Sequence, residues 1–119
     1  MDRTRVQQWI AGYERAWRTP GTETLSTLFT SDATYLQGPY HEPVVGLRDI
    51  CTMWEAERDG HDEEFGMSSE IIAVDGDVAV ARLEVRYGTG QEFRDLWLMT
   101  FAGDGRCVAF EEWPFSPPA

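Results

Sequence analysis

The hydrophobic pattern of the chain changes its period once, near Phe65, and this change constrains the fold more than any other feature. From that residue onward, apolar and polar side chains alternate, which is typical of β-strands. Glycine-containing turns at Asp75-Gly76, Gly88–Gly90 and Gly103–Gly105 divide this half of the chain. The pattern predicts an antiparallel meander of three consecutive hairpins, with strands over residues 65–74, 77–87, 91–102 and 106–113.

The first half of the chain carries apolar residues at helical spacing instead. It predicts helices over residues 4–18, from a cap at Thr22 to Phe29, and over 47–58, with a short strand at Ala33–Leu36 and a loop at Gln37–Gly46. A charged connection, Asp59–Glu64, leads into the strands. Helices followed by a run of strands indicate the α+β class, with three N-terminal helices covering one face of a curved, mostly antiparallel sheet.

Size and charge narrow the classes of function. A chain of 119 residues forms one domain, residues 1–119, of which Pro114–Ala119 is expected to be a loose tail. The net charge of −11 disfavours nucleic-acid and membrane partners, and the apolar runs are far shorter than the roughly 20 residues that span a bilayer. A polar N-terminus without a signal pattern and only two cysteines predict a cytoplasmic protein.

The strand at 91–102 is apolar on both faces. Asp95, Trp97, Met99 and Phe101 alternate with Leu96, Leu98 and Thr100. In a small α+β domain the helices cover one face of the sheet, so the other face needs a second partner. We therefore expect a homodimer that packs sheet to sheet.

Three short motifs resemble the nuclear transport factor 2-like superfamily, and its SnoaL-like and ketosteroid isomerase-like members in particular. They are Leu28-Phe29, then Asp32-Ala33-Thr34 and Gly46 before the third helix. The last two lie within DATYLQGPYHEPVVGLRDI, and the segment FAGDGRCVAFEEW near the end of the chain adds to the resemblance. The resemblance covers nearly the whole chain. It implies a cone of three helices and a curved sheet around an apolar cavity, commonly in a dimer.

The resemblance also implies roles for single residues. Tyr13 matches the tyrosine that donates to the oxyanion in ketosteroid isomerases, whereas Gln37 stands where these enzymes carry their carboxylate base. Trp97 stands at the second oxyanion donor. An amide cannot take up a proton at neutral pH, so steroid isomerisation by the mechanism of that family is not expected.

Strand alternation predicts which side chains surround the cavity. Asp95, Trp97, Met99, Phe110 and Glu112 share the concave face, and Tyr13, Trp17, Tyr35, Gln37 and Trp54 come from the covering elements. Burial next to aromatic rings should raise the pKa of both Asp95 and Glu112 toward a range useful for proton transfer. In the alternative reading, Asp95 pairs with Arg94 or Arg86 and Glu111 points inward in place of Glu112. His41, in the loop before the third helix, is either a further acid or base or a solvated residue.

Two functions fit this set of residues. The first is a cofactor-independent acid–base enzyme of the isomerase, cyclase or dehydratase type, with Tyr13, Asp95, Glu112 and His41 as catalytic residues and a small apolar or aromatic substrate. The second is a non-catalytic dimeric module that binds a ligand or a protein. Neither a phosphate-binding glycine loop nor the ligand spacing of a metal site occurs in the sequence, so we expect no cofactor and no metal.

Overall fold

A computed structural model describes residues 1–58 and 64–118 of the chain. Apart from Glu64, the predicted connection Asp59–Glu64 lies outside the described residues. The helical and strand elements are α1 (Arg3–Arg18), the 3-10 helix η1 (Glu23–Thr27), β1 (Phe29–Leu36), β2 (Val44–Val45), α2 (Leu47–Arg58), β3 (Phe65–Asp75), β4 (Val78–Tyr87), β5 (Glu92–Phe101) and β6 (Cys107–Phe115).

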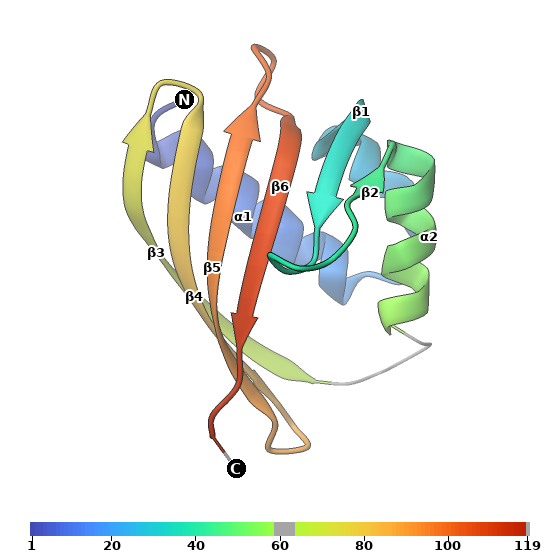
Figure 1. Cartoon of the computed structure of the whole chain (residues 1–119), viewed down its shortest axis with the longest axis vertical. Helices are drawn as coiled ribbons and strands as arrows, with labels where there is room; N and C mark the ends of the chain where they lie inside the picture. Colours follow the sequence, from blue (N-terminus) through green and yellow to red (C-terminus); the bar gives the residue numbers. More distant parts are fainter. Residues whose placement is uncertain (59–63, 119) are drawn as a thin grey trace.

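The strands form one curved sheet in the order β2-β1-β6-β5-β4-β3 (Figure 1). The predicted meander is confirmed, because β3, β4, β5 and β6 pair in succession as antiparallel neighbours. β1 pairs in parallel with the free edge of β6. This pairing connects segments far apart in the sequence and makes the sheet mixed. β6 continues two residues beyond the predicted strand end at 113, and Pro114 pairs with Asp95.

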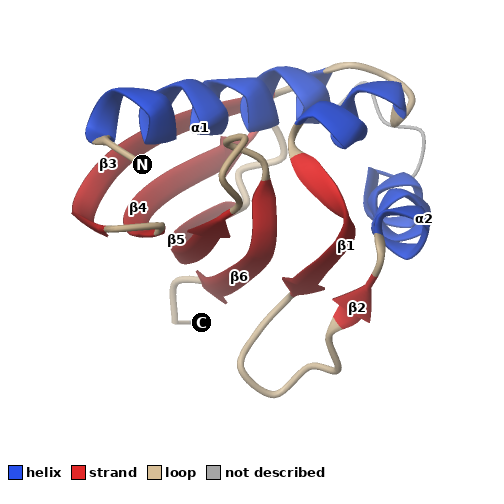
Figure 2. Cartoon of the chain, turned by 90° about the horizontal axis from the view of Figure 1, so that it is seen from above, coloured by secondary structure: helices blue, strands red, loops and turns tan. Residues whose placement is uncertain are grey.

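The helices cover the concave side of this sheet (Figure 2). α1 begins at Asp2, whose side chain accepts a hydrogen bond from the Arg5 amide at 2.8 Å, and it buries Val6, Trp9, Ile10 and Tyr13. The expected third helix is α2, which buries Ile50 and Trp54. The prediction of three α-helices was wrong in one respect: the short segment after Thr22 is only a five-residue 3-10 helix.

Arg58 connects the ends of the two α-helices. Its guanidinium group donates hydrogen bonds to the carbonyl oxygens of Ala16, in the last turn of α1, and of Thr19 and Gly21, which follow the helix. The Ala16 carbonyl also accepts from the Thr19 N–H at 3.2 Å, and a positive charge at a helix C-terminus interacts favourably with the helix dipole. The contact joins the C-terminal end of α2 to the C-terminal end of α1.

None of the described helices lies on the convex face of the sheet (Figure 1). Its central side chains are apolar and half-buried: Val80, Leu96, Leu98 and Trp113. Charged pairs flank them, such as Arg82 with Glu70 and Arg94 with Glu84. Among the described residues, no helix has the length and apolar character needed to cross a membrane.

Candidate active site

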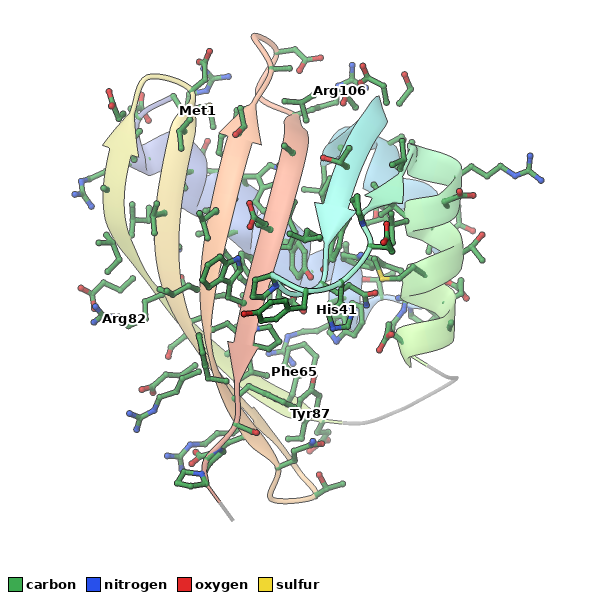
Figure 3. The ribbon with its side chains drawn as sticks, in the orientation of Figure 1. Met1, His41, Phe65, Arg82, Tyr87 and Arg106 are labelled. Atoms are coloured by element: carbon green, nitrogen blue, oxygen red, sulfur yellow. The ribbon has the colours of Figure 1, made fainter. Side chains whose placement is uncertain are left out.

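A cavity of about 380 Å³ lies between the concave face of the sheet and the two α-helices. Its lining comprises Tyr13, Trp17, Tyr35, Gln37, His41, Met53, Glu57, Phe65, Met67, Val85, Tyr87, Phe93, Asp95, Trp97, Glu112 and Pro114. The buried residues Tyr13, Tyr35, Asp95 and Trp97 form what we call the inner end. Half-buried or exposed residues, including the labelled Phe65, Tyr87 and His41, form the open end (Figure 3), and the half-buried Glu112 lies next to the phenols of the inner end.

Two phenols meet at the inner end. The hydroxyl oxygens of Tyr13 and Tyr35 lie 2.7 Å apart, and both side chains are buried. Burial raises the pKa of each phenol well above its usual value, and the nearby Glu112 carboxyl raises it further. Both hydroxyls therefore stay protonated at neutral pH, and one of them has a proton left to donate to a ligand.

Glu112 extends from β6 beside these phenols. Burial raises the pKa of its carboxyl from 4.5 to about 8, the negative charges of Asp95 and Glu57 raise it further, and the Tyr35 hydroxyl opposes the rise. At neutral pH this carboxyl is therefore mostly protonated. It can donate a proton or a hydrogen bond inside the cavity.

Asp95 extends from β5 on the same face and is only 8% exposed. Burial raises the pKa of its carboxyl from 3.8 to about 6, and the Phe115 backbone N–H and the Trp97 indole oppose the rise. In the described part of the chain, its Oδ1 atom and Nε1 of Trp97 have no hydrogen-bond partner of normal geometry. Oδ1 of the carboxylate and the indole N–H can thus both form a further hydrogen bond to a ligand.

The cavity brings together eight of the side chains predicted for the site, which are Tyr13, Trp17, Tyr35, Gln37, His41, Asp95, Trp97 and Glu112. Glu111, by contrast, accepts a hydrogen bond from the Trp113 indole at 2.9 Å, so Glu112 is the glutamate that lines the cavity. Arg94 and Arg86, the alternative partners of Asp95, pair with Glu84 and Glu92 instead.

Three predicted residues, Trp54, Met99 and Phe110, are absent from the lining because they pack into the core behind it. Trp54 contacts the rings of Tyr13 and Trp17 at centroid distances of 4.9 and 4.8 Å. Phe110 contacts the rings of Tyr13 and Tyr35 at 5.6 and 4.7 Å. Trp54 and Phe110 therefore support the phenols from behind.

Other lining residues were missed by the sequence analysis. Phe93 precedes Asp95 by two positions on β5, and Val85 and Tyr87 continue the buried alternation of β4. Glu57 follows Trp54 by one helical turn, and its carboxylate accepts a hydrogen bond from the Gln37 amide at 3.3 Å. These positions follow the same period-two and helical spacing as the lining residues that were predicted, so the spacing could have identified them. No cluster of three potential metal ligands occurs within residues 1–58 and 64–118.

Comparisons with known proteins agree with this architecture. Residues 6–110 match the family described as the SnoaL-like domain. A candidate isomerase of the SnoaL-like family from Agrobacterium tumefaciens superposes with a TM-score of 0.75 at 15% identity, over 94% of this chain and 98% of its own. A candidate polyketide cyclase from Sinorhizobium meliloti gives 0.70 at 24% identity, over 88% and 93%.

A steroid delta-isomerase from Pseudomonas aeruginosa superposes with a TM-score of 0.65 at 20% identity, over 93% of this chain and 80% of its own. No curated protein matches the sequence. At these identities the structural likeness establishes the fold alone. Since the family match covers most of the chain, the protein belongs to the SnoaL-like domain family.

Proposed function

We propose that the protein is a cofactor-independent acid–base enzyme of the isomerase, cyclase or dehydratase type. Its substrate is a small, mostly apolar molecule with a carbonyl or hydroxyl oxygen. The observation that carries the proposal is the pair of cavity carboxyls, Asp95 and Glu112, whose pKa values are raised to about 6 and about 8 beside a hydrogen-bonded phenol pair. Two carboxyls with separated pKa values supply a base and an acid at one pH.

The roles follow from the protonation states. At neutral pH the ionised Asp95 accepts a proton from a substrate carbon next to the carbonyl, and the protonated Glu112 returns one to another atom of the substrate. Tyr13 and the Trp97 indole donate hydrogen bonds to the oxygen on which negative charge develops. Protons then re-equilibrate at the open end, where His41 is exposed.

Gln37 supports a reaction other than that of the steroid isomerases. It stands where those enzymes carry their base, and its amide donates a hydrogen bond to Glu57. The base proposed for this chain comes instead from β5, which carries Asp95. The same amide is the observation that favours the second candidate function, a dimeric module that binds an apolar ligand or a partner protein without converting it.

Deuterium exchange at a carbon acid tests the proposal without knowledge of the natural substrate. 2-Tetralone, a small aromatic ketone, is incubated with the protein in D₂O, and loss of its α-proton signal is followed by NMR. We expect the wild-type protein to accelerate exchange and the double variant Asp95→Asn/Glu112→Gln to lose most of that acceleration. Glu111→Gln is the matched control, since it changes the neighbouring glutamate outside the cavity. Equal rates for the wild-type protein and the double variant would leave the binding module as the function.

We also propose a homodimer through the convex face of the sheet. The half-buried side chains of Val80, Leu96, Leu98 and Trp113 support it, because an apolar patch without a helix over it favours self-association. The dimer would stiffen β5 and β6, which carry Asp95 and Glu112 on their other face.

A cytoplasmic location is part of the same proposal. Cys51 lies on α2 and Cys107 on β6, and both are free thiols. Unpaired cysteines are typical of reducing compartments.

A further inference from the structure

We propose that the ligand of this cavity carries a positive charge, as a small aromatic or alicyclic molecule with a tertiary or quaternary ammonium group. The inference rests on the proposed function in one respect, namely that the cavity binds a small ligand. It adds a positive charge to the substrate class.

The first observation is an excess of acids without a permanent cation. Three carboxyls line the cavity, those of Glu57, Asp95 and Glu112, whereas no arginine is found among the described lining residues and the chain contains no lysine. The only basic side chain in that lining is His41, on an exposed loop. A cation in the ligand would supply the charge that the lining lacks.

The second observation is a buried acceptor without a partner. Asp95 is 8% exposed, and its Oδ1 atom accepts no hydrogen bond within the described chain. The arginines on the neighbouring strands are engaged elsewhere, since Arg86 pairs with Glu92 at 3.2 Å and Arg94 with Glu84 at 3.6 Å. A buried carboxylate oxygen without a partner is costly, and a ligand that brings the counter-charge reduces this cost.

The third observation is a group of aromatic rings next to this carboxylate. Phe93 precedes Asp95 by two residues on the same face of β5, and its ring contacts Tyr87, which in turn contacts Phe65, at centroid distances of 6.2 and 5.8 Å. Ring faces carry negative electrostatic potential and attract ammonium groups. The Phe65 ring already binds one cation in this way, because the Arg18 guanidinium carbon lies 4.0 Å from its centroid (Figure 3 labels Phe65 and Tyr87).

These observations together distinguish between ligand classes. A carboxylate ligand would meet three acids and no arginine, and a neutral hydrocarbon would leave Oδ1 of Asp95 without a partner. An ammonium group between Asp95 and Phe93 would neutralise the charge of the Asp95 carboxylate and form a cation–π contact with the Phe93 ring. It would also lower the pKa of Glu112, which like charges raise in the free protein, so binding near neutral pH should release a proton.

A pair of isosteric probes tests the charge alone. Phenyltrimethylammonium and tert-butylbenzene have the same shape, and the fluorescence of the tryptophans that line the cavity reports the binding of either one. We expect the cation to bind at least tenfold more tightly than the hydrocarbon. Calorimetry in two buffers of different ionisation enthalpy should show proton release with the cation and none with the hydrocarbon.

Variants then identify the groups responsible. Asp95→Asn should reduce the preference for the cation to less than threefold, and it should not impair folding because it removes a buried charge. Phe93→Leu should weaken cation binding about fivefold, as expected for a partly desolvated cation–π contact, and leave hydrocarbon binding within twofold. Glu111→Gln, outside the cavity, should change neither.

Three results would overturn the inference: equal binding of the two probes by the wild-type protein, an unchanged preference in Asp95→Asn, or an equal loss in Glu111→Gln. Equal binding would still leave the cavity as a ligand site with acid–base chemistry. Failure of the proposed function has a different signature, which is the absence of accelerated deuterium exchange in 2-tetralone.

Discussion

The hydroxyl oxygens of Tyr13 and Tyr35 lie 2.7 Å apart, although the two residues are 22 positions apart and belong to α1 and β1. Phe110 on β6 packs against both rings, so the pair joins the first helix to the strands on which the cavity acids lie. Neither phenol can move without disturbing the other. The donor that faces the cavity is therefore held in place before a ligand binds, which is the condition for effective stabilisation of an oxyanion.

Tyr13→Phe should destabilise the fold by about 1 to 3 kcal/mol, because it leaves the buried Tyr35 hydroxyl without its partner. Tyr35→Phe should cost a similar amount, and the double variant should cost less than the two single changes together, since neither phenol then remains unpaired. Urea unfolding of the four proteins provides the measurement. Strict additivity would mean that the two hydroxyls do not interact.

The stability of the protein should fall as the pH rises from about 4.5 to about 8. Glu112 has its pKa raised to about 8 in the folded state, so the native protein binds more protons than the unfolded chain over this range. The stabilisation is complete below pH 4.5 and is lost as the pH passes through 8. Glu112→Gln should flatten this decline and make the protein more stable than wild type at pH 9.

Urea midpoints at pH 5, 7 and 9 test this dependence. Asp95 contributes a decline of the same sign between about pH 4 and 6, because burial raises its pKa as well. Asp104→Asn is a useful control. Hydrogen bonds from Arg106 lower the pKa of the exposed Asp104 carboxyl, so this residue makes the stability rise with pH, opposite to Glu112 and Asp95. A midpoint that rises steadily from pH 5 to 9 in wild type would contradict the assignment of Glu112.

Leu98→Glu should convert the protein to a monomer. The residue is half-buried at the centre of the convex face, opposite Val80 on β4 and Glu111 on β6, and a charge there would be unpaired in a packed interface. Sedimentation should give twice the 13.6 kDa chain mass for wild type and a single chain mass for the variant. Tyr40→Ser, at a fully exposed loop position, should leave the mass unchanged. A wild-type protein that sediments as a monomer would remove the dimer proposal.

The parts of the fold that depend on neighbouring residues could be predicted from the sequence. The hairpins join strands that are adjacent in the chain, and turn glycines such as Gly76, with a φ of 58°, mark where they reverse. The parallel pairing of β1 with β6 connects distant segments and has no comparable local signal. The helix after Thr22 was predicted from a cap at Thr22 and from apolar spacing, but the Thr22 side chain makes no capping hydrogen bond, and the spacing does not distinguish a 3-10 turn from an α-helix of the same length.

The cavity was harder to predict than the fold for a related reason. Alternation identifies the inward face of a strand, and on this basis Asp95, Trp97, Met99 and Phe110 formed one group. Whether an inward side chain meets a hollow or another side chain depends on helix placement, so Met99 and Phe110 belong to the core whereas Asp95 and Trp97 line the cavity. The pairing of β5 with β6 also contains a register shift between Thr100 and Phe101. Such a shift interrupts the alternation along β6, so the sequence alone does not decide whether Glu111 or Glu112 points inward.

Comparison of Trp97→Phe with Trp54→Phe distinguishes a tryptophan that binds the substrate from one that only packs in the core. Both indoles are buried, and the Nε1 atom of each lacks a hydrogen-bond partner among the described residues. Replacing either indole removes an unsatisfied donor, which favours folding, and loses ring contacts, which opposes it. Because these contributions have opposite signs, we expect each variant to remain within about 1 kcal/mol of wild-type stability.

The two variants should differ in activity. Of Trp54 and Trp97, only Trp97 lines the cavity, so only Trp97→Phe should slow the deuterium exchange of 2-tetralone, by about tenfold if its N–H binds the developing oxyanion. Equal rates in the two variants would exclude the Trp97 indole as a donor and leave Tyr13 to stabilise the oxyanion.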